Sequence, residues 1–218
     1  MTSDPKQSAH GFLVTGTDTG IGKTVVSAML VRALNASYFK PVQAGLDEPT
    51  DTDAVRNLSA MPKDRFFPEC YRLKEPASPH LSAAMEGIEI DIDRLQLPRS
   101  EHPLIVEGAG GVMVPLTNSV LFIDMFAKWQ LPTILCARTS LGTINHTLLS
   151  LAALRDWNVP IHGVIFVGDA HEENESIIPR FGDVKHLGRV PFLNPLNQNS
   201  LTRVFEEKFN LNDFQSDL

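Results

Sequence analysis

The chain has 218 residues, of which 43% are hydrophobic and 21% charged, and this balance is ordinary for a globular protein with one core. The 19 basic and 26 acidic side chains give a formal net charge of −7, which argues against a surface that binds nucleic acid or an anionic membrane. Cys70 and Cys136 are the only cysteines and stand in neither a metal-binding nor a redox spacing. We therefore expect free thiols and a cytoplasmic location, and no apolar run reaches the length of a membrane span.

The order of elements predicts one α/β domain. Residues 1–10 are polar and lack the apolar segment of a signal peptide, so we predict a disordered lead-in. Apolar runs of strand length then alternate with helical patterns throughout residues 11–209, without a flexible linker or an internal repeat. This alternation is typical of a mostly parallel β-sheet with helices on both faces. Residues 210–218 are expected to fray.

The first strand, at residues 12–14, is followed by a glycine-bearing loop and a helical run. Strand, glycine loop, Gly-Lys-Thr and helix form the context of a phosphate-binding loop, because glycines let backbone N–H groups surround an anion at a helix N-terminus. Lys23 is placed to reach the β- and γ-phosphates, and Thr24 to ligate Mg²⁺. The alternative is a strand–helix turn that binds nothing. The nucleotide contacts expected in this segment are Thr17, Asp18, Thr19, Gly20, Ile21, Gly22, Lys23, Thr24 and Val25.

The second strand, at residues 37–42, brings Lys40 to its carboxyl end. Open α/β sheets bind ligands at that edge, although a lysine on an edge strand is usually solvated. Asp51 and Asp53 then begin a helix, where acidic side chains favour the positive end of the helix dipole. Capping explains both aspartates, and the alternative is that one of them faces the phosphates and holds a metal.

A third informative stretch is the apolar strand at residues 103–107, which ends in Glu107 and runs into a glycine-rich segment. A carboxylate in that place matches the metal-associated acid of phosphate-binding-loop proteins, and glycines let the backbone approach a ligand closely. A further strand at residues 132–137 leads to a long helix. Thr143 or Asn145 can cap this helix, whose N-terminus is suited to an anion. Strands at residues 163–167 and 186–192 follow.

Taken together, these motifs resemble the dethiobiotin synthetase family of the P-loop NTPase superfamily, from Gly11 to about Pro195. Five residues separate Gly16 from Gly22, where the general loop pattern has four, and the longer spacing is this family's own. The resemblance rests on Gly16-Thr17-Asp18-Thr19 with Gly22-Lys23-Thr24, Lys40-Pro41-Val42, Ser78-Pro79-His80, Glu107-Gly108-Ala109-Gly110-Gly111 with Pro115-Leu116, and Leu141-Gly142-Thr143-Ile144-Asn145-His146.

The resemblance implies a reaction in which 7,8-diaminopelargonate captures CO₂ as a carbamate, ATP phosphorylates the carbamate, and ring closure gives dethiobiotin, ADP and phosphate. It implies that the catalytic residues are Lys40, Lys23 and Thr19, and that Mg²⁺ is held by Thr24, Asp53 and Glu107. It also implies a homodimer whose substrate site lies at the subunit boundary. The substrates implied are the diamine and CO₂ or bicarbonate. The substrate contacts it implies are Thr19, Lys40, Ala44, Gly110 and Gly111, together with Leu141, Gly142, Thr143 and Asn145, which would receive the distal carboxylate of the substrate from the partner subunit.

Three positions depart from the family pattern. Gly20 stands where glutamate is frequent, Ala44 where a serine often contacts the substrate, and Gly168 where an asparagine usually precedes an aspartate that binds the base. ATP is the expected nucleotide, and other nucleoside triphosphates stay open. The base is expected between the last two strands, against Val167, Gly168, Val190, Pro191 and Phe192.

Three other functions compete with this prediction. A partitioning or metal-insertion ATPase would usually carry a lysine in the region of Asp18. An amidase-synthase of cobalamin synthesis would bring a glutaminase domain, for which the chain has no room. A nucleotide-binding module without catalysis would not need Lys23, Thr24, Asp53 and Glu107 together.

Overall fold

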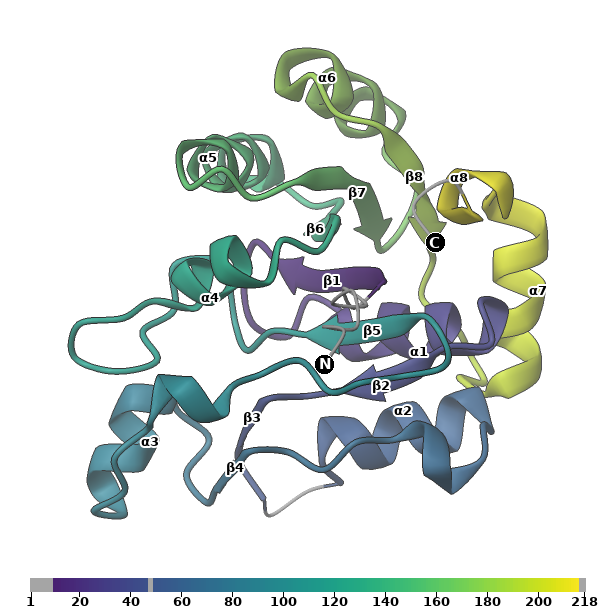
Figure 1. The fold of residues 1–218 in the computed structure, drawn as a ribbon. Coiled ribbons are helices and arrows are strands. Elements are labelled where there is room, and N and C mark those ends of the chain that lie inside the picture. The colour runs from purple at the N-terminus through teal and green to yellow at the C-terminus, as the bar shows by residue number, and fades with distance from the viewer. Residues whose placement is uncertain (1–9, 47–48, 216–218) are drawn as a thin grey trace, which may run out of the picture.

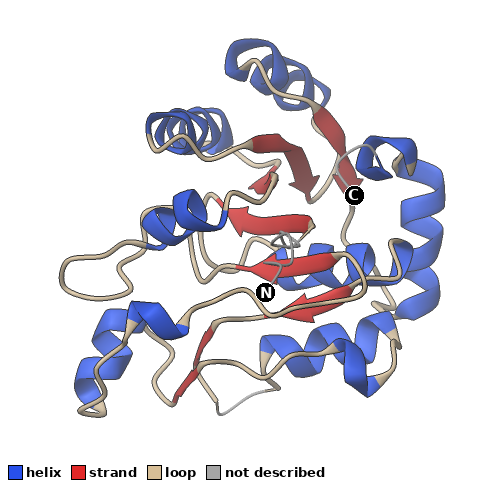
Figure 2. Cartoon of the chain, viewed as in Figure 1, coloured by secondary structure: helices blue, strands red, loops and turns tan. Residues whose placement is uncertain are grey.

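A computed structural model describes residues 10–46 and 49–215 of the chain (Figure 1). Almost all of the predicted lead-in at residues 1–10 lies outside the described residues, as do residues 47–48 and 216–218. The described residues form a central sheet with helices on both sides (Figure 2), which confirms the predicted α/β fold.

The central sheet consists of β1 (Gly11–Gly16), β2 (Ser37–Phe39), β5 (Leu104–Glu107), β6 (Thr133–Arg138), β7 (Ile161–Val167) and β8 (His186–Val190). All neighbouring strands pair in parallel, in the order β2-β5-β1-β6-β7-β8. The strand before the phosphate-binding loop, β1, therefore lies inside the sheet between β5 and β6.

Helices cover both faces because successive side chains of each strand point to opposite sides. Leu13 packs in the cluster on one face and Val14 in the cluster on the other. The first cluster is covered by α3 (Pro79–Met85), α4 (Phe122–Trp129), α5 (Thr143–Asp156) and α6 (Glu172–Gly182). The second is covered by α1 (Lys23–Ala33), α2 (Asp51–Ser59), α7 (Gln198–Lys208) and α8 (Asn212–Gln215). Cys136 is fully buried in the second cluster.

Two features were not foreseen. Two short strands, β3 (Val42–Ala44) and β4 (Tyr71–Leu73), form a second parallel sheet, and single 3₁₀ turns occur at Lys63–Arg65 and Ile92–Arg94. The strand predicted over residues 37–42 is therefore divided: β2 ends at Phe39 and Val42 begins β3. Between them, the Pro41 carbonyl accepts hydrogen bonds from the N–H groups of Cys70 and Tyr71, next to the new pairing.

The predicted fraying from residue 210 is wrong for residues 212–215, which form α8. Phe214 explains the order: it is fully buried, and its ring lies 5.8 Å, centroid to centroid, from the rings of both Phe12 and Phe205. The described residues include no helix that is both long and apolar enough to cross a membrane.

Candidate active site

Most of the predicted site residues lie along one edge of the central sheet. β1 runs into the phosphate-binding loop at residues 17–22, β2 leads to Lys40, and β5 ends at Glu107. Because all six strands are parallel, their carboxyl ends lie along the same edge, where open α/β sheets bind ligands. The other three strands of the sheet end there at Arg138, Val167 and Val190.

Four side chains form a hydrogen-bonded network beside the loop. Thr24 Oγ1 lies 2.7 Å from Asp51 Oδ1 and 3.2 Å from Glu107 Oε1. Lys40 Nζ lies 2.8 Å from Asp51 Oδ2 and 3.0 Å from Glu107 Oε1, and it also donates to the Gly108 carbonyl at 3.0 Å. The network thus joins two carboxylates, one ammonium group and one hydroxyl.

Lys40 is buried rather than solvated. Its side chain is 3% exposed and that of Glu107 is 1% exposed. Burial by itself lowers the pKa of Lys40, but the charges of Glu107 and Asp51 outweigh it and raise the pKa above its ordinary value. Burial by itself raises the pKa of Asp51, but Lys40 and the hydrogen bond from Thr24 bring it below its ordinary value. Both Lys40 and Asp51 therefore stay charged at neutral pH.

Tyr38 is a fifth member of the network that sequence analysis missed. Its side chain is fully buried, and its hydroxyl donates to Glu107 Oε2 at 3.1 Å. Burial first, and then the charges of Glu107 and Asp51, raise the pKa of Tyr38 well above its ordinary value, so the phenol remains a donor. The sequence did hold a signal for Tyr38, because residues two apart on a strand point to the same side and Tyr38 lies two residues before Lys40.

The loop supplies a second ammonium group. Lys23 is the first residue of α1, and its Nζ donates to the Asp18 carbonyl at 2.9 Å. Burial first, and then repulsion from Lys40, lower the pKa of Lys23. Gly22 precedes the helix at φ 96° without any side-chain cap, and a Cβ there would lie 2.9 Å from Val167. Glycine therefore leaves the first N–H groups of α1 free to face an anion.

Three cavities surround the loop. The first, of about 440 Å³, is lined by the charged network and by the predicted residues Thr19, Gly20, Ile21, Gly22, Lys23, Thr24, Lys40, Ala44, Glu107 and Gly110. The second, of about 430 Å³, is lined by Gly20, Ile21, Gly22, Val25, Val167, Val190, Pro191 and Phe192. The third, of about 530 Å³, is more open to solvent, and it is lined by Thr17, Asp18, Thr19 and Gly111 together with part of α5.

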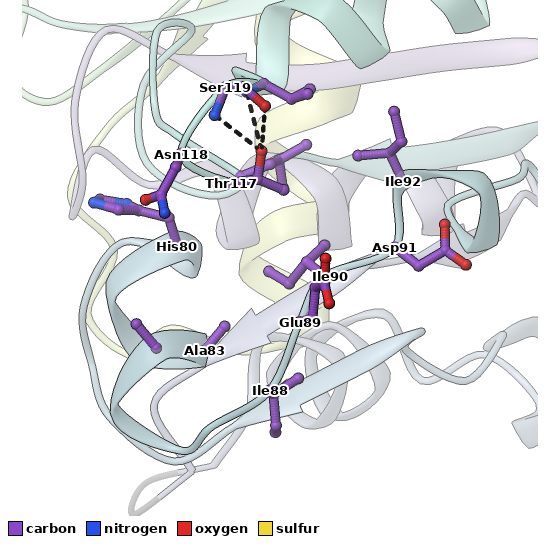
Figure 3. Close-up of a pocket in the computed structure, with 13 residues that line it drawn as sticks. His80, Ala83, Ile88, Glu89, Ile90, Asp91, Ile92, Thr117, Asn118 and Ser119 are labelled. Carbon is purple, nitrogen blue, oxygen red and sulfur yellow. Dashed lines mark hydrogen bonds between the residues drawn. The ribbon is translucent and has the colours of Figure 1, made fainter.

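A larger cavity of about 820 Å³ lies apart from the loop, between α3, residues 88–92 and residues 116–120 (Figure 3). Its charged side chains are the carboxylates of Glu89 and Asp91, and among the described residues it has no lysine or arginine in its lining. A triphosphate needs positive charge, so volume alone does not make this cavity the nucleotide site.

The structure places Asp51, not Asp53, in the network, so Asp53, which was predicted to hold Mg²⁺, lies outside it. The Asp53 carboxylate turns back to accept hydrogen bonds from the N–H and hydroxyl groups of Thr50, and it pairs with Arg56 at 2.6 Å. Side chains two residues apart on a helix point about 200° apart, so only one aspartate can face the loop. The signal was the capping-box spacing Thr50-x-x-Asp53, which reserves the second aspartate for the helix end.

The predicted caps of α5 differ from the structure. Gly142, at φ 93°, precedes α5 without a side-chain cap, and the hydroxyl of Thr143 donates to the Arg138 carbonyl at 2.6 Å, so neither Thr143 nor Asn145 caps the helix. Residues 141–145 line none of the three cavities beside the loop within the described subunit, and their substrate contact, expected from the partner subunit, stays a prediction.

Gly168, which was expected to lie against the base, does not line the second cavity. Its N–H donates to the Val190 carbonyl, and its own carbonyl accepts a hydrogen bond from Arg189 at 3.0 Å. Its backbone is therefore engaged within the sheet edge, and its neighbour Val167 lines the cavity instead.

Comparison with known proteins decides the family. The family model described as an AAA domain matches residues 10–200. The ATP-dependent dethiobiotin synthetases of Rhodopseudomonas palustris (strain BisA53) and Agrobacterium fabrum (strain C58) are each 56% identical to the chain, over 205 and 203 residues. These alignments cover 94% and 93% of this chain, and 96% of each relative. The chain belongs to the ATP-dependent dethiobiotin synthetase family. It is thus an ATP-dependent enzyme of the ligase type that acts in biotin biosynthesis.

Solved structures share the fold of this synthetase family at low identity. A ParA family ATPase from Chlorobium tepidum superposes with a TM-score of 0.54 at 13% identity, covering 97% of this chain and 96% of that one. The MinC:MinD cell division complex of Aquifex aeolicus gives a TM-score of 0.50 at 11% identity, covering 89% and 86%. These structures support the P-loop architecture alone, and the family rests on the synthetases.

Proposed function

We propose that the chain converts 7,8-diaminopelargonate, CO₂ and ATP into dethiobiotin, ADP and phosphate. One amine captures CO₂ as a carbamate, and a carbamate oxygen takes the γ-phosphoryl group to give a carbamic–phosphoric anhydride. The second amine then attacks the carbonyl carbon and expels phosphate, which closes the cyclic urea. The observation that carries this assignment is that two ammonium groups, those of Lys23 and Lys40, line one cavity beside the phosphate-binding loop.

The ammonium groups suit phosphoryl transfer, which depends on positioning and on positive charge around the oxygens. The Lys23 side chain, at the start of α1, contacts the γ-phosphate in this proposal. Lys40 reaches the carbamate from the end of β2. Thr19 and Gly110 line the same cavity and contact the diamine side of the substrate.

Thr24, Asp51 and Glu107 form the ligand set for Mg²⁺ in this proposal. Mg²⁺ binds oxygen ligands in octahedral geometry at about 2.0–2.1 Å, so neighbouring ligand oxygens lie about 2.9 Å apart. The Thr24 hydroxyl oxygen lies 2.7 Å and 3.2 Å from the two carboxylate oxygens, which fits two such edges. When bound, Mg²⁺ neutralises charge on the β- and γ-phosphates.

The second cavity receives the nucleotide base. Its walls are largely apolar, and Phe192, which is 76% exposed, offers an aromatic face for stacking. The side chains in its lining that can hydrogen-bond a base are those of Arg138 and Ser140. ATP is the proposed nucleotide, and this sparse polar lining keeps other nucleoside triphosphates open as substrates.

A homodimer completes the site in this proposal. Leu141 is fully exposed, and Met113 and Leu149 are exposed beside the open third cavity, an unusual setting for large apolar side chains. A second copy of α5 packed there would cover them and direct its N-terminus at the substrate carboxylate. The cytoplasmic location is supported by the two free thiols, Cys70 and Cys136.

The test is formation of dethiobiotin, followed by mass spectrometry, from 7,8-diaminopelargonate, bicarbonate, ATP and Mg²⁺. Asp51→Asn should lower kcat/KM by about 10²–10³-fold because it removes a proposed metal ligand. Asp53→Asn is the matched control, two residues away on the same helix, and should retain activity within a few-fold. ATP hydrolysis without dethiobiotin would refute the proposed reaction, and equal losses in the two variants would refute the ligand set.

A further inference from the structure

Lys40 holds the same two carboxylates that form the proposed metal set. Its Nζ lies 3.0 Å from Glu107 Oε1, and this is the oxygen that the Thr24 hydroxyl also approaches at 3.2 Å. On the other side the ammonium lies 2.8 Å from Asp51 Oδ2. A divalent ion bound to these side chains would therefore share a ligand oxygen with the Lys40 ammonium.

The charges do not favour holding both cations at once. Asp51 and Glu107 together supply two negative charges, which a divalent ion alone neutralises. Lys40 beside that ion would add an excess positive charge where the Glu107 carboxylate is 1% exposed, and like charges repel most strongly where water is excluded. The ammonium and the divalent ion are thus alternative partners of one pair of carboxylates.

We infer that Lys40 leaves Asp51 and Glu107 when a divalent ion binds to them, and that the freed ammonium turns into the adjoining 440 Å³ cavity. The inference rests on the metal set proposed above. Lys40 already lines this cavity, and its hydrogen bond to the Gly108 carbonyl at 3.0 Å gives it a partner that the metal does not take.

Tyr38 keeps the carboxylate in place during this exchange. It donates to Glu107 Oε2, whereas Lys40 and Thr24 approach Oε1, so the two oxygens have separate partners. Loss of Lys40 therefore leaves Glu107 oriented with Oε1 toward the loop. The consequence is that metal loading and delivery of the Lys40 ammonium to the proposed carbamate are one event.

The first experiment measures Mn²⁺ binding to the full chain without nucleotide, from the loss of the free Mn²⁺ signal in electron paramagnetic resonance. Lys40→Met should bind Mn²⁺ at least tenfold more tightly than the unaltered chain, because it removes the competing ammonium. Lys23→Met is the matched control, since it removes a nearby ammonium whose Nζ bonds to the Asp18 carbonyl instead. Its affinity should change less than threefold. Unchanged or weaker binding in Lys40→Met, or equal gains in both variants, would overturn the exchange.

A second measurement needs no substitution and remains decisive if Lys40→Met folds poorly. Acylation of Lys40 by an amine-reactive ester, read by mass spectrometry of its peptide, should accelerate at least fivefold with 10 mM Mg²⁺. The same ionic strength of NaCl is the control. No acceleration by Mg²⁺ overturns the inference.

A third variant separates this inference from the proposed metal set. Mn²⁺ binding that survives Asp51→Asn overturns the ligand set, and the exchange with it. Mn²⁺ binding that requires Asp51 but is indifferent to Lys40→Met overturns the exchange alone, while dethiobiotin formation tests the reaction independently of both.

Discussion

Replacing Lys40 by methionine should destabilise the fold as well as stop the reaction. The side chain is of similar length, so the change removes the ammonium while keeping most of the packing. It leaves Glu107, 1% exposed, and the partly exposed Asp51 without their cation. Breaking a buried ion pair from one side costs about 3–5 kcal/mol, since a charge remains uncompensated in the interior. For a domain of this size, 1 kcal/mol lowers Tm by about 2–4 °C, so Tm should fall by roughly 6–20 °C.

The matched double variant Lys40→Met/Glu107→Gln tests the cause of that loss. It removes the charges of both Lys40 and Glu107, so no unpaired charge remains at position 107. Calorimetry at pH 7 should therefore show the double variant to be more stable than Lys40→Met by about 2 kcal/mol or more. Both variants should fail to form dethiobiotin. A Lys40→Met unfolding free energy within about 1 kcal/mol of the unaltered chain, or a double variant no more stable than the single one, would refute the reasoning.

Three further predictions concern the acid limit, the thiols and the C-terminus. Burial by itself raises the pKa of Asp51, but the opposing effect of Lys40 is larger, so the pKa of Asp51 in the folded protein lies below its ordinary value. The ionised carboxylate therefore stabilises the fold above about pH 4, and this contribution is lost as the pH falls through the folded pKa. Urea melts at pH values from 5 down through the folded pKa should show a smaller loss of stability for Asp51→Asn than for the unaltered chain. Burial raises the pKa of Cys136 to about 12, so a thiol reagent at pH 8 should label Cys70 in the native protein and Cys136 only in urea; native labelling of both would contradict this burial. Phe214→Ala should cost about 3–5 kcal/mol by calorimetry, and a cost below about 1 kcal/mol would show that α8 is not packed as described.

Much of the site could be predicted from the sequence because its signals are local. Gly22-Lys23-Thr24 follows an apolar strand and opens a helix, so the anion site is specified by neighbours in the chain. Lys40 follows an apolar strand and Glu107 is the last residue of another, and parallel pairing brings such strand ends to one edge of a sheet. The alternation of apolar, strand-length runs with helical patterns likewise predicted the α/β layers.

The tertiary structure alone decided which of these side chains meet. The capping-box spacing reserves Asp53 for the end of α2, but it does not say what Asp51 meets. The packing of α2 against α1 brings Asp51 to Thr24. Tyr38 donates a hydrogen bond to Glu107, which lies 69 positions away in the sequence. Phe214 packs against Phe12, which lies near the opposite end of the chain. Backbone geometry along the chain fixes local elements, whereas contacts between distant elements follow from packing, which no short stretch of sequence encodes by itself.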